Sequence, residues 1–183
     1  QAADHPFRVP YDGSFRIVGT PTGSPPGSPG KKALKKQLAT QVRRLRTLQE
    51  SLYAVDTRAV LLVFQAMDAA GKDGTIRAVM SGVNPAGCQV YSFKQPSKKE
   101  LDHDFLWRSS KCLPERGRIG IFNRSYYEEV LVVRVHPEYL GGQQLGELPS
   151  DLEPLWEGRY ASIRDHEQHL ARNGTVVLKF WLN

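Results

Sequence analysis

The stretch Ala59-Val-Leu-Leu-Val-Phe-Gln-Ala-Met-Asp-Ala-Ala-Gly-Lys-Asp-Gly-Thr-Ile76 decides the fold of this chain. It begins with an unbroken apolar run, residues 59–64, which is typical of a parallel strand buried on both faces. A glycine-containing turn follows at once, and the residues after it can open a helix. A strand, a loop of small residues and a helix in this order predict a phosphate-binding loop, or P-loop.

The chemistry of such a loop explains its residue types. Small residues allow successive backbone N–H groups to converge on phosphate oxygens, and the N-terminus of the following helix adds a positive field. A lysine then reaches the outer phosphates. The sequence supplies these parts at Ala69, Ala70, Gly71, Lys72 and Gly74. The alternative is a Gly-Lys turn that binds nothing, which the strand-loop-helix context disfavours.

Two positions depart from the common pattern G-x-x-x-x-G-K-[ST]. Ala66 replaces the first glycine, and Asp73 stands where a magnesium-binding hydroxyl is usual, which weakens a simple ATPase interpretation. The carboxylates of Asp68 and Asp73 would repel phosphate unless a divalent cation intervenes. We therefore expect Asp68 to be a ligand of Mg²⁺, with Mn²⁺ as a substitute.

Further apolar runs predict three more strands, over residues 88–93, 118–122 and 175–182. Stretches able to form helices separate them. The clearest helices are residues 31 to about 53 and 154–172, in which apolar residues recur every three or four positions. This alternation predicts an α/β fold with a parallel sheet.

The chain divides into an arm and one domain. Residues 1–30 contain six prolines together with glycine and serine, so we expect an extended arm without regular structure. Residues 31–183 are long enough to bury one substantial core. The loop 137–154 is expected to be irregular. No crossover helix follows the last predicted strand, so we expect the domain to be incomplete at its C-terminus.

The composition narrows the classes of protein. No apolar run is long enough to span a bilayer, and the N-terminus lacks the pattern of a signal peptide. The two cysteines, Cys88 and Cys112, lack the spacing of a zinc site or a disulfide framework. We expect a soluble, cytoplasmic protein. The net charge of +6 favours polyanions without choosing among nucleic acid, acidic lipid, nucleotides and polyphosphate.

The first predicted helix also carries a basic face. Such a face can hold a polyanion, but a solvated helix surface is the commoner explanation. The cations are Lys31, Lys32, Lys35, Lys36, Arg43, Arg44 and Arg46.

Three more motifs follow the P-loop in order. They are Phe93-Lys-Gln-Pro-Ser97, Glu100-Leu-Asp-His-Asp-Phe-Leu-Trp-Arg108 and Ile121-Phe-Asn-Arg-Ser-Tyr-Tyr-Glu-Glu-Val-Leu-Val-Val-Arg-Val-His136. With the P-loop they resemble the second family of polyphosphate kinases, from about residue 31 to the C-terminus. The resemblance implies a three-layer α/β/α fold of the P-loop kinase type. It also implies Mg²⁺-dependent, reversible phosphate transfer between inorganic polyphosphate and adenine nucleotides, AMP and ADP giving ADP and ATP.

The same resemblance implies a dimer or tetramer, no specific nucleic-acid partner, and a helical lid that would lie beyond Asn183. Residues 66–75 correspond to the Walker A segment and residues 119–126 to the Walker B-like segment. Lys72 is expected on the transferred phosphate, and Asp68 is expected to organise magnesium and the acceptor phosphate. With Arg124, these two residues form the expected catalytic set.

The second motif bears on the acceptor. Members that use ADP commonly have Asp-Arg-Ser there, whereas this chain has Asn123-Arg124-Ser125, and Asp73 replaces their glycine. Both departures resemble the members that accept AMP as well as ADP. The residues expected to bind phosphate or nucleotide are Ala69, Ala70, Gly71, Asp73, Gly74, Thr75, Lys94, Arg108, Asn123 and Ser125.

Arg124 and Lys94 also have a physical argument. Each follows a predicted strand at the sheet edge where ligands bind in open α/β folds. A forked guanidinium suits phosphate, although an ion pair of Arg124 with Glu128 or Glu129 is the alternative, and both can hold. Lys94 is equally well explained as a solvated lysine, and Arg108 is a weaker candidate of the same kind.

The histidines are not expected to act in catalysis. His103 lies between two aspartates, Asp102 and Asp104, in a helix-like stretch. His166 and His169 are three apart on a predicted helix, but no third metal ligand is evident and we interpret them as surface residues.

Two other functions remain open. An ATP-dependent nucleoside monophosphate kinase would share this fold and loop and would differ in its phosphate donor. A non-catalytic polyanion-binding module would bind with strong salt dependence and show no Mg²⁺-dependent turnover.

Overall fold

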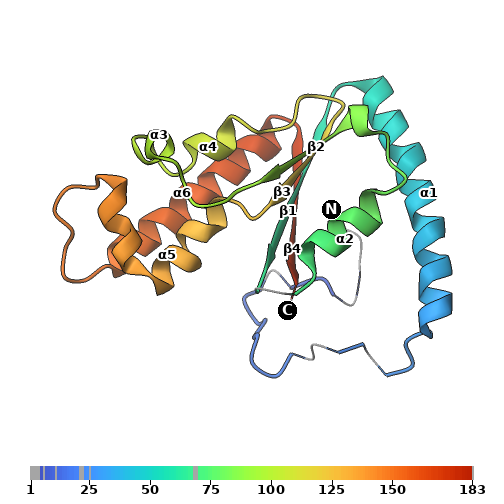
Figure 1. Ribbon diagram of the computed structural model, residues 1–183, viewed down its shortest axis with the longest axis horizontal. Helices are drawn as coiled ribbons and strands as arrows, with labels where there is room; N and C mark the ends of the chain where they lie inside the picture. Colours follow the sequence, from blue (N-terminus) through green and yellow to red (C-terminus); the bar gives the residue numbers. More distant parts are fainter. Residues whose placement is uncertain are drawn as a thin grey trace.

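A parallel four-stranded sheet lies between two groups of helices (Figure 1). The structure is a computed structural model that describes residues 5, 7–10, 12–20, 23, 24, 26–67 and 70–182. The described residues before Lys31 are exposed and include no helix or strand. With η for 3₁₀ helices, the elements are α1 Lys31–Val55, β1 Ala59–Ala66, α2 Lys72–Met80, η1 Pro85–Gly87, β2 Cys88–Ser92, α3 Lys98–Leu101, α4 Trp107–Ser110, β3 Ile119–Asn123, η2 Tyr126–Glu129, α5 Val132–Val135, η3 Pro137–Gln143, α6 Glu153–Arg172 and β4 Thr175–Leu182.

The strand order is β2-β3-β1-β4, which places β1 in the middle of the sheet. Val60 of β1 pairs with Ile119 of β3, and Ala59 pairs with Thr175 of β4. Leu61 and Val63 are almost fully buried, because helices cover both faces of the central strand. The four predicted strands and their parallel arrangement are confirmed.

The helices form the two outer layers. Helices α1 and α2 lie on one face of the sheet and α6 lies on the other (Figure 1). Each face contains a separate hydrophobic cluster. Successive side chains of β1 alternate between these clusters, as the pleat of a strand requires. The clusters are Phe64, Ile76, Ile119 and Ile121 with Leu52 on the first face, and Leu61, Val63, Phe122, Ile163 and Leu170 on the second. The expected three-layer α/β/α fold is confirmed.

The segment 137–154 differs from the expected irregular loop. Its first half forms η3, because Leu140 is 1% exposed and packs with Val133 and Trp156 in a third small cluster. One apolar side chain in a glycine-rich stretch gave too weak a signal for this turn to be predicted.

The strands end together at one edge of the sheet. Asn123 of β3 is level with Phe64 of β1 and with Ser92 of β2. The segments that follow these three strands therefore leave from the same side, where ligands of open parallel sheets bind. The P-loop, Lys94 and Arg124 are all in these segments.

Candidate active site

The P-loop leaves β1 at Ala66, and α2 begins at Lys72. Gly71 precedes the helix with φ 79° and ψ 20°, a left-handed conformation that glycine adopts without steric penalty. The N–H of Thr75 donates to the carbonyl of Gly71 at 2.9 Å. Asp68 and Ala69 lie outside the described residues, so their expected roles stay predictions.

Gly74, in the first turn of α2, faces open space. A Cβ atom placed there would meet nothing within 4 Å, so packing inside the protein does not require a glycine. The N–H groups of a first helical turn lack partners within the helix and carry the positive end of its dipole. This end of α2 is therefore open to close approach by an anion.

A hydrogen bond joins the P-loop helix to strand β3. Nδ2 of Asn123 donates to Oδ1 of Asp73 at 2.5 Å. An ionised carboxylate only accepts hydrogen bonds, so an aspartate at position 123 could not replace this donor. The two departures that resemble the AMP-accepting members, Asp73 and Asn123, are thus one chemically matched pair in space.

Arg124 has an unusual backbone. Its φ of 62° is in the left-handed region, which costs a non-glycine residue about 1–3 kcal/mol and is found most often at functional sites. Its N–H donates to the carbonyl of Phe64 at 3.0 Å, and its Nη1 lies 3.4 Å from Oε2 of Glu128. The side chain stays 42% exposed. The alternative ion pair is therefore present, and the guanidinium remains accessible.

Ser125 lies beneath this edge and is 0% exposed. Its hydroxyl accepts from Nε2 of Gln65 at 3.1 Å and from the N–H of Tyr127 at 3.1 Å. These bonds cap η2 and tie it to β1. In this structure Ser125 holds the segment that follows Arg124.

Lys94 and Arg108 meet at the end of β2. Nη1 of Arg108 donates to the carbonyl of Lys94 at 2.8 Å, and the guanidinium lies 5.4 Å from the ring centroid of Phe93. The side chain of Lys94 is exposed. The motif around Arg108 is thus anchored to the same sheet edge as the P-loop.

The charges of the three motifs converge on Glu128, which sequence reasoning treated only as a partner of Arg124. Its side chain is 17% exposed, and burial raises the pKa of its carboxyl above the ordinary value. The positive charges of Arg124, Lys72 and Arg108 act on this pKa in the opposite direction. Glu128 therefore pairs with Arg124 and lies within electrostatic range of Lys72 and Arg108.

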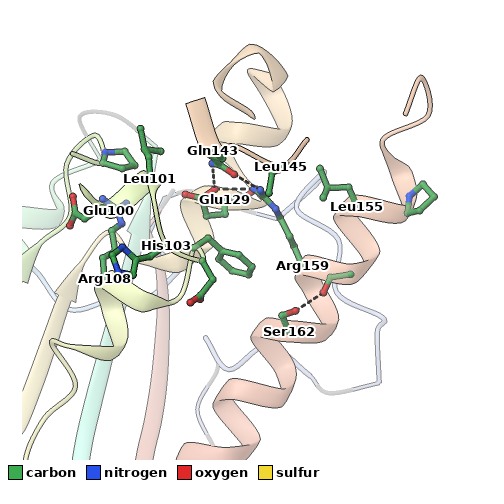
Figure 2. Close-up of a pocket in the computed structure, with 15 residues that line it drawn as sticks. Glu100, Leu101, His103, Arg108, Glu129, Gln143, Leu145, Leu155, Arg159 and Ser162 are labelled. Carbon is green, nitrogen blue, oxygen red and sulfur yellow. Dashed lines mark hydrogen bonds and ion pairs between the residues drawn. The ribbon is translucent and has the colours of Figure 1, made fainter. Parts of the chain in front are cut away.

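A cavity of about 390 Å³ lies between the segment that carries Arg108 and helix α6 (Figure 2). Arg108 and His103 line one side, and Arg159 of α6 lies across from them. Phe105 and Leu155 contribute apolar surface. The residues come from four separate stretches of the chain, so no local pattern predicted the cavity.

The wall of the cavity contains a buried ion pair. Nη1 of Arg159 lies 2.9 Å from Oε2 of Glu129, and both side chains are 5% exposed. Gln143 completes the group, because its Nε2 donates to Oε2 of Glu129 at 2.8 Å and its Oε1 accepts from Nη2 of Arg159 (Figure 2). Buried charges need such partners, and here each has them.

A second polar cluster holds η2 from its other side. Oε1 of Glu167 accepts from the hydroxyls of Tyr126 at 3.0 Å and Tyr127 at 2.8 Å, and Nζ of Lys179 donates to Oε2 at 2.6 Å. Burial raises the pKa of Tyr127 to about 12, so its hydroxyl remains a donor at neutral pH. The cluster fixes η2 to α6 and β4.

The histidines differ from one another. His169 is exposed, as expected, but the surface interpretation is wrong for His166, which is half-buried with its ring 5.6 Å from that of Tyr126. Burial lowers the pKa of His166. His103 stacks on Trp107 at 3.8 Å between ring centroids, and its Nδ1 is 2.8 Å from the carbonyl of Lys99.

The donor chemistry of the P-loop fits Mg²⁺ bound together with phosphate. Mg²⁺ in phosphate sites commonly takes one or two carboxylates and completes its shell with water and phosphate oxygens. Asp73 supplies one carboxylate at the loop. Among the described residues, which leave out Asp68, no three His, Cys, Asp or Glu side chains gather as a metal site. No helix in the described part of the chain is long and apolar enough to cross a membrane.

Known proteins resemble this chain over most of its length. The model of the Polyphosphate kinase 2 (PPK2) family matches residues 29–183. An ADP-polyphosphate phosphotransferase of Rhodopseudomonas palustris is 62% identical over 146 residues, which cover 80% of this chain and 50% of the relative. An AMP/ADP-polyphosphate phosphotransferase of Meiothermus ruber is 47% identical over 178 residues, which cover 97% of this chain and 62% of the relative.

A solved structure agrees with these relatives. The crystal structure of polyphosphate kinase 2 from Arthrobacter aurescens TC1 matches with a TM-score of 0.82 and 40% identity, covering 93% of this chain and 58% of that one. The chain spans about half of the first relative and about three fifths of the other two.

Proposed function

Because the chain belongs to the polyphosphate kinase 2 family, we propose that it transfers phosphate between inorganic polyphosphate and adenine nucleotides. The observation that carries the proposal is that Lys72, Arg108 and Arg124 all lie in segments at one edge of the sheet: α2 begins at Lys72, Arg108 bonds the carbonyl of Lys94, and Arg124 follows β3. Three cations from three elements at one sheet edge can hold several neighbouring phosphate groups. Of the two relatives named above, one is an ADP-polyphosphate phosphotransferase and the other is an AMP/ADP-polyphosphate phosphotransferase.

Phosphoryl transfer requires positioning and charge neutralisation rather than a covalent intermediate on the protein. In the proposed reaction, the N–H groups of the first turn of α2 and Nζ of Lys72 hold the phosphate that is transferred. Arg124 neutralises the acceptor phosphate, whose oxygen attacks the terminal phosphorus of polyphosphate in line; the P–O bond on the opposite side breaks, and polyphosphate shortened by one phosphate leaves. Glu128 keeps the guanidinium in place before the substrate arrives.

A divalent cation belongs to the proposal. Asp68 would hold Mg²⁺, with Asp73 close by, and the bound cation would neutralise charge on the phosphates. The remaining predicted contacts of the loop and of Lys94 and Asn123 stay part of the same proposal, and Ser125, which is buried, would contribute by holding the segment that carries Arg124.

We place the nucleoside of the acceptor in the cavity of Figure 2. Its volume of about 390 Å³ is in the range of small-ligand sites, and its lining combines apolar side chains such as Phe105 and Leu155 with polar side chains that can bond a base or ribose. Arg108 lines the cavity and also acts on Glu128, so it connects the nucleoside to the phosphates.

The matched pair of Asp73 and Asn123 supports use of AMP as well as ADP. Asn123→Asp would bring two carboxylates together and should lower turnover, and adding Asp73→Gly should restore it in part. The ratio of AMP to ADP turnover measures acceptor preference. An unchanged ratio in both variants would remove this pair from acceptor choice.

The deciding experiment measures ADP and ATP made from AMP or ADP with long-chain polyphosphate as the only donor, with and without Mg²⁺. Lys72→Ala and Asp68→Asn should each lower turnover by several orders of magnitude without unfolding the chain. Arg164→Ala, an exposed change on α6, is the control. Near-normal turnover in either variant would contradict the assignment of Lys72 and Asp68 to the active site.

The same assay separates the rival functions. Reaction of ATP with AMP, and none with polyphosphate, would identify a nucleoside monophosphate kinase. Salt-dependent polyphosphate binding without turnover would identify a binding module. The helical lid implied by the family resemblance is tested by the same assay on a longer chain, which is extended past residue 183 with the corresponding segment of a relative.

Cytoplasmic location and assembly into dimers or tetramers complete the proposal. The free thiols of Cys88 and Cys112 support a reducing compartment. Sedimentation at several protein concentrations tests the assembly, and a single monomer species throughout would exclude it.

A further inference from the structure

The beginning of α1 carries charge in an arrangement that is unfavourable for a free helix. Lys31 and Lys32 are in its first turn and Lys35 and Lys36 in the next. The first turn has no acidic residue, and Gly30 provides no side-chain cap. Cations at a helix N-terminus oppose the helix dipole. The lysines also form two like-charge pairs four residues apart, which repel each other.

In the part of the chain that the structure describes, no acidic side chain neutralises these charges. The lysines are exposed, and Glu50, the single acidic residue of α1, pairs with Arg46 at 3.0 Å. Within the described residues, no carboxylate forms an ion pair with any of the four lysines. An anionic ligand would relieve the repulsion and complete the helix terminus at the same time.

Most of the cations lie along one side of α1 in two groups, Lys31, Lys32, Lys35 and Lys36 in the first two turns and Arg43 and Arg46 about two turns further along. At about 100° per residue, six of the seven lie within an arc of about 140°, and at about 1.5 Å per residue this stripe is about 22 Å long. A shallow surface hollow lies at its beginning, lined by Gly30, Lys31, Lys32, Ala33 and Lys36. We call this stripe the lysine face; it consists of Lys31, Lys32, Lys35, Lys36, Arg43 and Arg46.

The position of the lysine face relates it to the active site. Figure 1 shows α1 beginning at the end of the molecule towards which β1 and β4 point, with α2 between α1 and the sheet. The P-loop leaves β1 at that same end. A long anion that leaves the P-loop therefore has a second basic surface on the same end of the protein.

We infer that the lysine face is an accessory binding site for inorganic polyphosphate, which holds a part of the chain distant from the phosphate being transferred. The inference rests on the proposed use of polyphosphate. A linear anion matches a stripe of this length, and flexible lysines bind phosphate as point charges without demanding one geometry.

Two other polyanions fit the lysine face less well. Single-stranded nucleic acid is held by aromatic stacking in addition to cations, and the one aromatic residue of α1, Tyr53, is near its other end. A membrane surface would require a free apolar face. The apolar side of α1 faces the protein in its second half, where Leu52 packs in the core and Val42 and Leu45 are half-buried. Beside the lysines, the exposed large apolar side chains are Leu34 and Leu38, at 43% and 40%, and two partly exposed leucines make a smaller apolar face than a membrane-bound helix needs.

The test compares two variants that lose the same charge. Lys35→Gln with Lys36→Gln removes two charges from the lysine face, and Arg164→Gln with Arg172→Gln removes two exposed charges from α6. Binding of long-chain polyphosphate and of tripolyphosphate is measured at several salt concentrations. The lysine-face variant should bind the long chain about three- to ten-fold more weakly, with tripolyphosphate unchanged. Its salt slope should fall by about 1.4, the value for two lost contacts with a flexible polyanion.

Equal binding of the long chain by the two variants would overturn the inference. Loss of binding to phosphatidylserine vesicles or single-stranded DNA, with polyphosphate binding unchanged, would also overturn it and assign the face to those partners. A different result would contradict the proposed function: no variant transfers phosphate, but binding of long-chain polyphosphate still depends on the lysine face. In a Lys72→Ala background transfer should be abolished, and the lysine-face change should still weaken long-chain binding more than the α6 change does.

Discussion

Glu128 and Glu129 are neighbours in η2, yet their ion pairs have opposite characters. The pair of Glu128 with Arg124 has a distance of 3.4 Å and leaves the Arg124 side chain 42% exposed. The pair of Glu129 with Arg159 has a distance of 2.9 Å, and both partners are 5% exposed. The 3₁₀ turn directs the carboxylate of Glu128 towards the phosphate site and that of Glu129 into the protein.

In the first pair, Arg124 can exchange Glu128 for a bound phosphate, whereas the buried second pair cannot exchange partners. A partly exposed pair contributes little to stability, because water screens it, so a phosphate can take over Arg124. Removing one partner of a buried pair leaves a charge without water or counterion. We therefore expect the first pair to affect turnover and the second to affect folding.

The largest effect is expected for Arg159→Met. It leaves Glu129 buried without its counterion and should lower the free energy of unfolding by about 3–5 kcal/mol, measured by urea denaturation. Arg134→Met is the matched control, because it breaks a surface pair with Glu153 and should have a much smaller effect. Similar losses in the two variants would contradict the distinction.

Arg124→Gln should lower turnover by about 10²–10³-fold, the effect typical of losing one charged donor at a reacting centre. The urea midpoint should shift little. Initial rates with polyphosphate and AMP provide the measurement. Loss of stability with normal turnover of the folded fraction would reverse the roles of the two pairs.

The double change Glu129→Gln with Arg159→Met should recover most of the stability that Arg159→Met alone removes. Replacing a whole buried ion pair by neutral groups is often close to neutral, and the new amide can donate to Gln143. A double-mutant cycle in urea measures the coupling. Additive losses would show that Glu129 and Arg159 act independently.

The smallest effect is the pH dependence of Glu128. Its pKa is raised in the folded chain, so the folded state binds the proton more tightly than the unfolded state does. This stability is fully present below the ordinary carboxyl pKa near 4.5 and is lost as pH rises through the folded pKa. Above pH 4.5 the unmodified chain loses this part of its stability, whereas the Glu128→Gln variant has no carboxyl at this position to lose a proton. The free energy of unfolding of the variant should therefore rise relative to that of the unmodified chain. Parallel stability curves from pH 4 to 8 would contradict this.

The sequence predicted the parts of this molecule whose causes are local. Apolar runs identified all four strands, and the glycines and lysine after Phe64 identified the P-loop. The pair of Glu129 and Arg159 joins η2 to α6, and nothing near either residue in the chain indicates the other. His166 was misjudged for the same reason, because its burial depends on Tyr126, which is distant in sequence.

Glu128 could be predicted as a partner of Arg124 because the two residues are four apart in the chain. The bond between Asp73 and Asn123 was not found, although both residues were singled out, since it depends on the register of β1 and β3. Sequence motifs named the residues of the site, and the sheet determined which of them meet.

The central position of β1 also has a consequence for how the protein assembles. The strand that carries the P-loop is completed by β3 on one side and by β4 on the other, and Ala59 must find Thr175 across nearly all of the intervening domain. Contacts so distant in sequence form late and slowly, because a long loop must close first. During synthesis, the strand that supports the P-loop therefore gains its second neighbour only after every other helix and strand described here has been made.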